Sequence, residues 1–241
     1  EFAGNTFPAP KNLDKLIRSV AHDSGIDYSG QQLEAIREAA TSGLLLITGG
    51  PGTGKTTILN GILELLGRMQ LRCLLAAPTG RAAKRLSEVT GEDASTIHRL
   101  LEAGIDPATG KMFFARDEEN PLKCDAVVVD EMSMVDVQLL HSLLRAIPQG
   151  KRLILVGDPD QLPPVGPGFP FGDMLRSGVL PTVHLTEIFR QAQQSLIVMN
   201  AHRVNHGEMP DLRCVTSDFF FMRRNNEEAV CSLIRDLCAV R

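Results

Sequence analysis

The sequence predicts a three-layer α/β domain, in which helices cover both faces of a mainly parallel sheet. Two observations support this fold class. Amphipathic segments with helical spacing alternate with short apolar runs, which is typical of parallel strands buried on both faces. A glycine-rich loop also joins the first apolar run directly to a helical segment. The expected strands of the sheet are 44–48, 73–77, 125–129, 152–156 and 182–185.

Length and composition limit the class of protein. The 241 residues allow one large or two small domains, and 43% hydrophobic residues suffice for a sizeable core. No apolar run approaches the ~20 residues of a membrane span, and no basic-then-apolar signal appears at the N-terminus. Five scattered cysteines without a CxxC motif predict reduced thiols in a cytoplasmic protein. A net charge of −4 argues against non-specific coating of nucleic acid, but it allows a local basic groove.

Two helices are expected before the first strand. Residues 11–22 carry apolar side chains at helical spacing, and Ser29 is a suitable N-cap for a helix over 30–40. Gln32 lies in this second helix. Its amide offers a donor and an acceptor that could pair with both edges of an adenine. Taken alone, Gln32 has a plainer interpretation as a surface residue of the helix.

The loop after the first strand carries the strongest motif. Residues 44–57 read LLLITGGPGTGKTT, which places G-x-x-x-x-G-K-[ST] between a strand and a helix. Glycines let the backbone approach a phosphate, and the loop amides and the helix N-terminus point donors at the anion. Lys55 would reach the β and γ phosphates, and the Thr56 hydroxyl would hold Mg²⁺. A chance glycine-rich turn is the alternative, and the strand-loop-helix context disfavours it. The expected nucleotide contacts of the loop are Gly50, Pro51, Gly52, Thr53, Gly54, Lys55, Thr56 and Thr57.

The second strand leads into a basic segment. Residues 68–87 include five basic residues and no acidic residue. Thr79 and Gly80 begin a helix within this segment, where backbone amides and a hydroxyl suit a phosphate. The basic residues could instead form a solvated helix face. Another helix is expected to begin near the start of 95–101, and 104–120 is typical of a surface loop or weak hairpin.

An acidic pair follows the third strand. Three valines at 127–129 predict a buried strand, and Asp130 and Glu131 come directly after them. In a phosphate-loop protein, a carboxylate at such a strand end completes the Mg²⁺ shell, which is the role expected of Asp130. Glu131 would then face the attacking water and act as the general base or orient the water. An ordinary helix cap is the alternative interpretation of the pair.

The fourth strand ends in a stiff polar loop. Residues 157–165 read GDPDQLPPV and follow the strand directly, at the sheet edge where α/β proteins bind ligands. Gln161 in this loop could sense a γ phosphate or the water beside it, although a plain proline-rich turn is the alternative. The other expected elements are helices at 58–69, 82–89, 135–147, 171–177, 195–205 and 226–240, and a strand at 218–222.

Six motifs resemble those of the first motor domain of superfamily 1, group B helicases, and in particular of RecD-type DNA helicases. They begin at residues 49, 77, 95, 127, 155 and 185 and read GGPGTGKTT, APTGRAAKRL, STIHRLL, VVVDEMSMV, LVGDPDQLPPVGPG and LTEIFRQ. TGRAA, TIHRLL and DEMSM are more diagnostic than the phosphate loop, which many NTPases share. The resemblance implies a RecA-like P-loop NTPase domain that uses ATP and Mg²⁺.

The resemblance also implies roles for individual residues. Gln32 matches the family's adenine-binding glutamine, and Asp130 and Glu131 match its Mg²⁺ ligand and catalytic glutamate. Gln161 matches a glutamine that links the γ phosphate to the DNA-binding surface, and Arg190 matches an arginine that contacts the γ phosphate. The residues that match motifs lining the path of single-stranded DNA are Pro78, Thr79, Gly80, Arg81, Thr96 and His98.

The chain departs from the family pattern in two places. Residues 169–172, FPFG, stand where the family usually begins a helix with polar and aliphatic residues, which leaves the start of that helix open. No motif of a second RecA-like domain follows Arg190. We therefore expect a fragment, with a lead-in and short helix at 1–28, the motor domain at 29–207, and a strand and helix at 208–241 that lead toward a second motor domain.

The resemblance implies a domain of an ATP-dependent DNA helicase, which couples ATP hydrolysis to translocation on single-stranded DNA and to duplex unwinding in recombination or repair. The expected partners are single-stranded and duplex DNA, with nuclease or recombination subunits, and no membrane. We expect the fragment alone to be a weak ATPase. Two alternatives are a phosphate-loop ATPase without nucleic acid and an ATP-dependent switch subunit of a nuclease or conjugation complex.

Overall fold

The computed structural model describes residues 2–213 and 218–239, with the backbone alone at 190 and 191. The chain divides into two compact units, Glu1–Ile188 and Phe189–Arg241. The first unit holds the sheet and the helices around it. The domain limits expected from the sequence, with boundaries after residues 28 and 207, stay predictions. None of the helices in the described part of the chain has the length and apolar character to cross a membrane.

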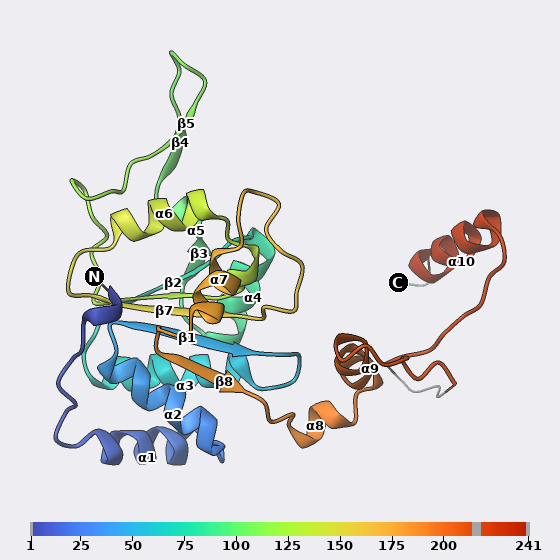
Figure 1. Ribbon diagram of the computed structural model, residues 1–241, viewed down its shortest axis with the longest axis horizontal. Helices are drawn as coiled ribbons and strands as arrows, with labels where there is room; N and C mark the ends of the chain where they lie inside the picture. Colours follow the sequence, from blue (N-terminus) through green and yellow to red (C-terminus); the bar gives the residue numbers. More distant parts are fainter. Residues whose placement is uncertain (1, 214–217, 240–241) are drawn as a thin grey trace. The chain divides into compact units, whose positions relative to one another are not determined.

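Six strands form the main sheet of the first unit (Figure 1). Every neighbouring pair is parallel, so the carboxyl ends of all six strands lie at the same edge. The α/β class and the five expected strands are confirmed. In spatial order the strands are β3 (Ala94–Thr96), β2 (Cys73–Ala77), β6 (Ala126–Val129), β7 (Arg152–Gly157), β1 (Leu44–Gly49) and β8 (Thr182–Leu185).

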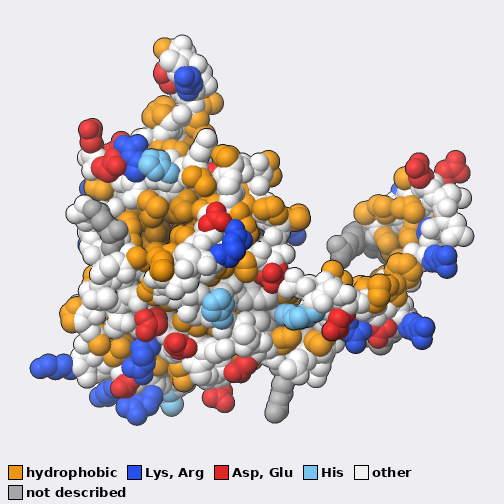
Figure 2. Space-filling view, in the orientation of Figure 1, with side chains coloured by type: hydrophobic (Ala, Val, Ile, Leu, Met, Phe, Trp, Pro, Cys, Tyr) orange, Lys and Arg blue, Asp and Glu red, His pale blue; other side chains and the backbone are white. Residues whose placement is uncertain are grey.

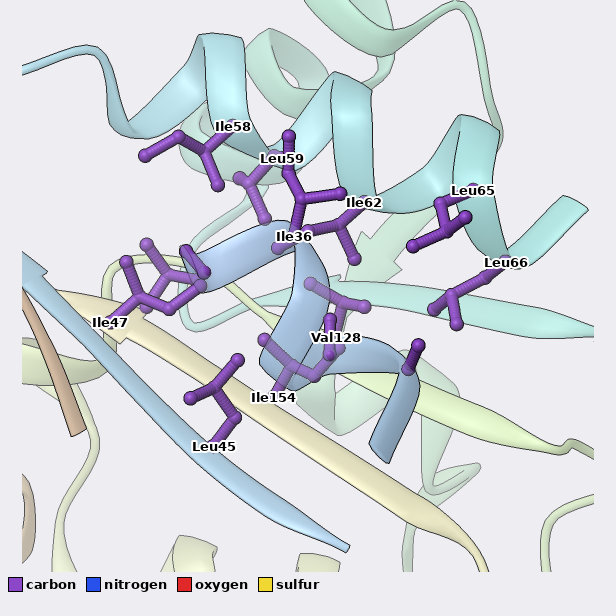
Figure 3. Close-up of a cluster of buried hydrophobic side chains, with 14 of the residues drawn as sticks. Ile36, Leu45, Ile47, Ile58, Leu59, Ile62, Leu65, Leu66, Val128 and Ile154 are labelled. Atoms are coloured by element: carbon purple, nitrogen blue, oxygen red, sulfur yellow. The ribbon is translucent and has the colours of Figure 1, made fainter. Parts of the chain in front are cut away.

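Two apolar clusters lie on opposite faces of the sheet, and alternate strand residues divide between them. On β1, Leu45 and Ile47 belong to one cluster, whereas Leu44 and Leu46 belong to the other. This alternation is the period of two that a strand covered on both faces requires. The first face carries α1 (Leu13–Ser24), α2 (Gly30–Thr41), α3 (Lys55–Arg68) and α4 (Gly80–Thr90), and Figure 3 shows side chains of α2 and α3 above β1, β6 and β7. The second face carries α5 (Ile97–Leu100), α6 (Val137–Ala146) and α7 (Pro170–Ser177).

The segment between α5 and β6 forms a hairpin of the strands β4 (Ala103–Ile105) and β5 (Met112–Phe114). One of the two expected forms of 104–120 is thus confirmed. The hairpin projects from the body of the first unit (Figures 1 and 2). Its residues Ile105 and Met112 are 71% and 60% exposed. The short strand β3 was not expected, because its residues, AST, form no apolar run. As an edge strand, β3 pairs with β2 alone.

The residues 169–172 do not prevent a helix. α7 begins at Pro170, in the first turn, where the missing amide of proline costs no intrahelical hydrogen bond. Phe171 is fully buried beside the end of β7, where a Cβ on Gly157 would lie 2.8 Å from the phenylalanine ring. The backbone of Gly157 therefore makes room for Phe171, which anchors the start of α7.

The second unit contains α8 (Arg190–Gln193), α9 (Leu196–Asn205) and α10 (Glu227–Ala239). The side chain of Asn200 closes a turn after α9, since it donates to the Asp211 carbonyl and accepts from the Asp211 amide. The prediction of a strand at 218–222 is wrong, because these residues belong to no strand. Phe220 and Phe221 are about half exposed, and no neighbouring strand in the described part of the unit offers hydrogen bonds.

Glycine at position 61 is required by packing and not by backbone conformation. Gly61 lies inside α3, and a Cβ there would lie 2.8 Å from both the Tyr28 hydroxyl and Ile36 Cδ1. We expect Gly61→Ala to destabilise the protein by about 1–3 kcal/mol, although alanine favours helices. Gly67→Ala is the matched control in the same helix, where a Cβ meets nothing within 4 Å, and it should stabilise by about 0.5–1 kcal/mol. Urea denaturation measures both, and equal stability of the two variants would contradict the packing argument.

Candidate active site

The loop between β1 and α3 has a backbone that only small residues allow. Gly52 and Gly54 have positive φ angles of 77° and 81°, and Gly54 caps α3. The Thr53 hydroxyl donates to the Gly50 carbonyl over 2.8 Å, which closes the loop on itself. A Cβ on Gly49 would lie 2.6 Å from the Thr53 hydroxyl and 2.9 Å from Leu185. The glycines and the Thr53 hydrogen bond thus hold the loop backbone in a tight turn, as a phosphate cradle requires.

Lys55 is the first residue of α3 and folds over this loop. Its ammonium donates to the Gly49 carbonyl over 2.5 Å and to the Gly50 carbonyl over 3.1 Å. Thr56 and Thr57 follow in the first turn of the helix and are partly exposed. The predicted loop residues therefore converge on the N-terminus of α3, where the helix dipole favours an anion.

Asp130 and Glu131 come directly after β6, at the same edge of the sheet. One carboxylate oxygen of Asp130 accepts from the Glu131 amide over 2.9 Å. Burial raises the pKa of the Asp130 carboxyl above its usual range, and the positive charges of Lys55 and Arg85 act in the opposite direction. Glu131 has a positive φ of 56°, which is uncommon for a residue with a side chain. Its Oε2 is buried without a hydrogen-bond partner among the described residues.

Gln161 lies in the loop after β7, between the other two site segments, because β7 is placed between β6 and β1. The side chain of Gln161 is exposed, and the backbone amide of Gln161 donates to the Asp158 carbonyl over 3.2 Å. Asp158 is buried, and its carboxylate accepts from the Asp160 amide, which holds the loop at the end of the strand. The loop is therefore a fixed part of the carboxyl edge and more than a loose turn.

Gln32 is not a surface residue of α2, as the plainer interpretation held. It is 1% exposed and forms a capping box, in which its side-chain oxygen accepts from the Ser29 amide over 3.0 Å. Its Nε2 group is buried without a partner among the described residues. A buried amide that keeps an unused donor suits a ligand with an acceptor, such as the edge of an adenine.

The predicted DNA-path residues lie at the β3–β2 side of the same edge. Pro78 follows β2, and Thr79 caps α4 by accepting from the Ala82 amide. Thr96 is paired beside Ala77 and caps α5 in the same way. The remaining members, Gly80 and Arg81, begin α4, and the His98 ring lies 5.8 Å from the Phe114 ring of the hairpin. The structure thus brings two motifs, 17 residues apart at their threonines, to neighbouring strand ends.

Comparison with known proteins identifies the family. The family model described as an AAA domain matches residues 32–167, which include Gln32, the phosphate loop, Asp130, Glu131 and Gln161. The chain belongs to the AAA domain family.

One relative of this AAA domain is named as a helicase, and another is named as a subunit of the RecBCD enzyme. The ATP-dependent RecD2 DNA helicase of Deinococcus radiodurans is 43% identical over 218 residues, which cover 84% of this chain and 29% of that protein. The RecBCD enzyme subunit RecD of Mycolicibacterium smegmatis is 41% identical over 168 residues, 60% of this chain and 30% of that protein. The resemblance to RecD-type helicases is thereby confirmed. The chain spans less than a third of the length of each of these two relatives.

A solved structure shares the fold. The crystal structure of Pif1 helicase from Candida albicans matches with a TM-score of 0.55 at 23% identity, over 90% of this chain and 56% of that chain. The match supports a parallel sheet with helices on both faces as the fold of this AAA domain, in agreement with the predicted RecA-like architecture.

The AAA domain offers oxygen ligands that fit Mg²⁺. The Thr56 hydroxyl is in the first turn of α3, and the Asp130 carboxylate follows β6, so both lie at the carboxyl edge of the sheet. Hydroxyl and carboxylate oxygens are the ligands that Mg²⁺ prefers beside nucleotide phosphates. The burial that raises the pKa of Asp130 is a cost that a bound cation would offset.

Arg190 cannot be placed in the AAA domain site. It is the first residue of α8, in the second unit, and its side chain lies outside the described residues. No sequence pattern indicates a role for Gln31, whose side-chain amide pairs with the Thr186 amide and hydroxyl at 2.9 and 3.0 Å. The two residues are 155 positions apart, so no local pattern predicts the contact. It fixes the start of α2 to the motif that leads to Arg190.

Proposed function

We propose that the chain is the first motor domain of an ATP-dependent DNA helicase, which couples ATP hydrolysis to translocation on single-stranded DNA and to duplex unwinding. The observation that carries this proposal is the convergence of the phosphate loop, Asp130, Glu131 and Gln161 at one sheet edge, beside the DNA-path motifs after β2 and β3. The names of the relatives, ATP-dependent DNA helicase among them, support the same reaction.

Each residue except Arg190 has a role that its position supports, and the role of Arg190 rests on the resemblance alone. The unused donor of Gln32 would pair with the adenine, and the loop amides with Lys55 would hold the phosphates. Thr56 and Asp130 would hold Mg²⁺, which neutralises charge on the phosphates when it is bound. Glu131 would take a proton from the attacking water. Gln161 would contact the γ phosphate. Arg190 would stabilise the negative charge of the transferred phosphoryl group.

The partners are single-stranded and duplex DNA. Relatives named as subunits of the RecBCD enzyme support a second candidate, in which the parent protein is an ATP-dependent subunit of a nuclease or recombination complex in the cytoplasm. A pull-down with Lys55→Ala separates the two: a switch subunit loses its partner when nucleotide binding is lost, whereas a motor keeps it. A phosphate-loop ATPase without nucleic acid would bind nucleotide but retain no oligonucleotide.

DNA binding by the basic segment is tested at Arg81. Arg81 is exposed in the first turn of α4, where a guanidinium suits a phosphate. We expect Arg81→Ala to weaken binding of a labelled single-stranded oligonucleotide and to reduce the slope of log affinity against log salt by about 0.7. Fluorescence anisotropy at several salt concentrations measures both. Arg18→Ala, an arginine on α1, is the control, and equal effects of the two variants would show that only the overall charge matters.

A further inference from the structure

Two polar side-chain atoms at the site are buried without a partner among the described residues. They are Oε2 of Glu131 and the hydroxyl of Ser133, which is 0% exposed. More than 90% of buried polar groups in proteins have a hydrogen-bond partner, so two such atoms within three consecutive residues require an explanation. A polar group buried without a partner costs stability, and a role in function is one reason to retain it.

The hydroxyl of Ser133 has no structural task in the turn. Residues Met132–Met134 form a short 3-10 helix, which is closed by backbone hydrogen bonds from Met134 to Glu131 and from Val135 to Met132, both 3.1 Å. The next helix, α6, is capped by Asp136, whose carboxylate accepts from the Leu139 amide. Turn and cap are thus complete without Ser133.

The surroundings of Ser133 would suit an apolar side chain. Met132 directly before it and Val135 two residues after it are fully buried, whereas Met134 is 46% exposed, and the 3-10 helix packs against β7 and α7. An alanine would fill this position without an unpaired hydroxyl. The serine therefore adds nothing to the packing, and its hydroxyl is two residues from the proposed general base.

We propose that Ser133 is a positioning residue for hydrolysis: its hydroxyl donates to the Glu131 carboxylate in the hydrolysing state and holds that carboxylate toward the attacking water. Hydrogen bonds of catalytic groups often form only in the reacting complex, which accounts for two unpaired atoms within three residues. A rotation about the side-chain bonds of Ser133 or Glu131 is sufficient to change the direction of either group. The assignment rests on the proposed function, because it gives Glu131 the role of base.

The test compares Ser133→Ala with the wild-type chain. We expect kcat for ATP hydrolysis to fall about 10- to 100-fold, the size of a lost supporting hydrogen bond to a functional group, with KM and the Kd of ADP within about twofold. The affinity for ADP with fluoroaluminate, a mimic of the transferred phosphoryl group, should fall by the same factor as kcat. The melting temperature without nucleotide should stay equal or rise, since an unpaired buried hydroxyl is removed.

Two further variants make the test specific. In the Glu131→Gln background, Ser133→Ala should not weaken fluoroaluminate binding further, because the carboxylate that the hydroxyl positions is gone. Ser142→Ala is the matched control, since the Ser142 hydroxyl on α6 bonds the Gln138 carbonyl, and it should change nothing. If wild type hydrolyses ATP and Ser133→Ala leaves kcat and fluoroaluminate affinity unchanged, or lowers the melting temperature together with kcat, the inference is wrong and the proposed function stands. If wild type neither binds ADP nor hydrolyses ATP, the proposed function itself fails.

Discussion

Glu131→Gln is expected to lower kcat for ATP hydrolysis by about 10²- to 10⁴-fold, the usual contribution of a general base. Glutamine keeps the shape of the side chain but cannot accept a proton from water at neutral pH. Asp130, the loop and Lys55 are unchanged by the substitution, so the Kd of a fluorescent ADP should stay within about twofold of wild type. Phosphate release and nucleotide fluorescence, measured on the same preparation, give the two quantities.

The control is the same substitution at Glu102. Glu102 also has a positive φ, 53°, but it is exposed and pairs with Arg116 at 2.6 Å, outside the site segments. Glu102→Gln should leave kcat unchanged, which shows that the loss at Glu131 does not come from glutamine in a left-handed backbone. Equal activity of Glu131→Gln and wild type would remove Glu131 from the mechanism.

The central strands could be predicted from sequence because both of their faces are buried. Apolar runs such as 44–48 and 152–156 leave no exposed face, and the sheet satisfies them with helices above and below. The edge strand β3 was missed and a strand at 218–222 was predicted in error, and both errors have the same reason. A strand forms only beside a partner: β2 gives the polar residues of β3 a partner, and the described second unit gives Phe220 and Phe221 none.

The placement of the candidate site residues could be predicted where a motif fixes a residue type next to a strand end. Lys55 and Asp130 follow from spacing and from the position of parallel strand ends at one edge. The burial of Gln32 and the unpaired hydroxyl of Ser133 could not be predicted in this way. Spacing reports which face of an element a residue lies on, whereas the pairing of one polar atom depends on side chains from distant segments.

Lys55→Ala is expected to raise the Kd for ATP about 10- to 150-fold, which corresponds to the about 1.5–3 kcal/mol of a hydrogen bond to a charged group. The ammonium of Lys55 is held 2.5 Å from the Gly49 carbonyl and 3.1 Å from the Gly50 carbonyl, so it is already placed over the loop that would bind the phosphates. Alanine removes this ammonium from the start of α3, and the loop amides remain. Isothermal titration with ATP and Mg²⁺ measures the loss.

Lys55→Arg tests whether charge alone suffices. A guanidinium keeps the charge but is planar and wider than an ammonium, so we expect it to restore less than a tenth of the lost affinity. Lys15→Ala, an exposed lysine on α1, is the control for net charge and should bind ATP as wild type does. The Gly49 and Gly50 carbonyls are partly exposed and can bind water after the substitution, so the free energy of unfolding should change by less than about 1 kcal/mol. A loss of ATP binding that occurs together with unfolding would therefore count against a direct role of Lys55. A loss of ATP binding in a variant that stays folded is the result expected if the Lys55 ammonium contacts the phosphates.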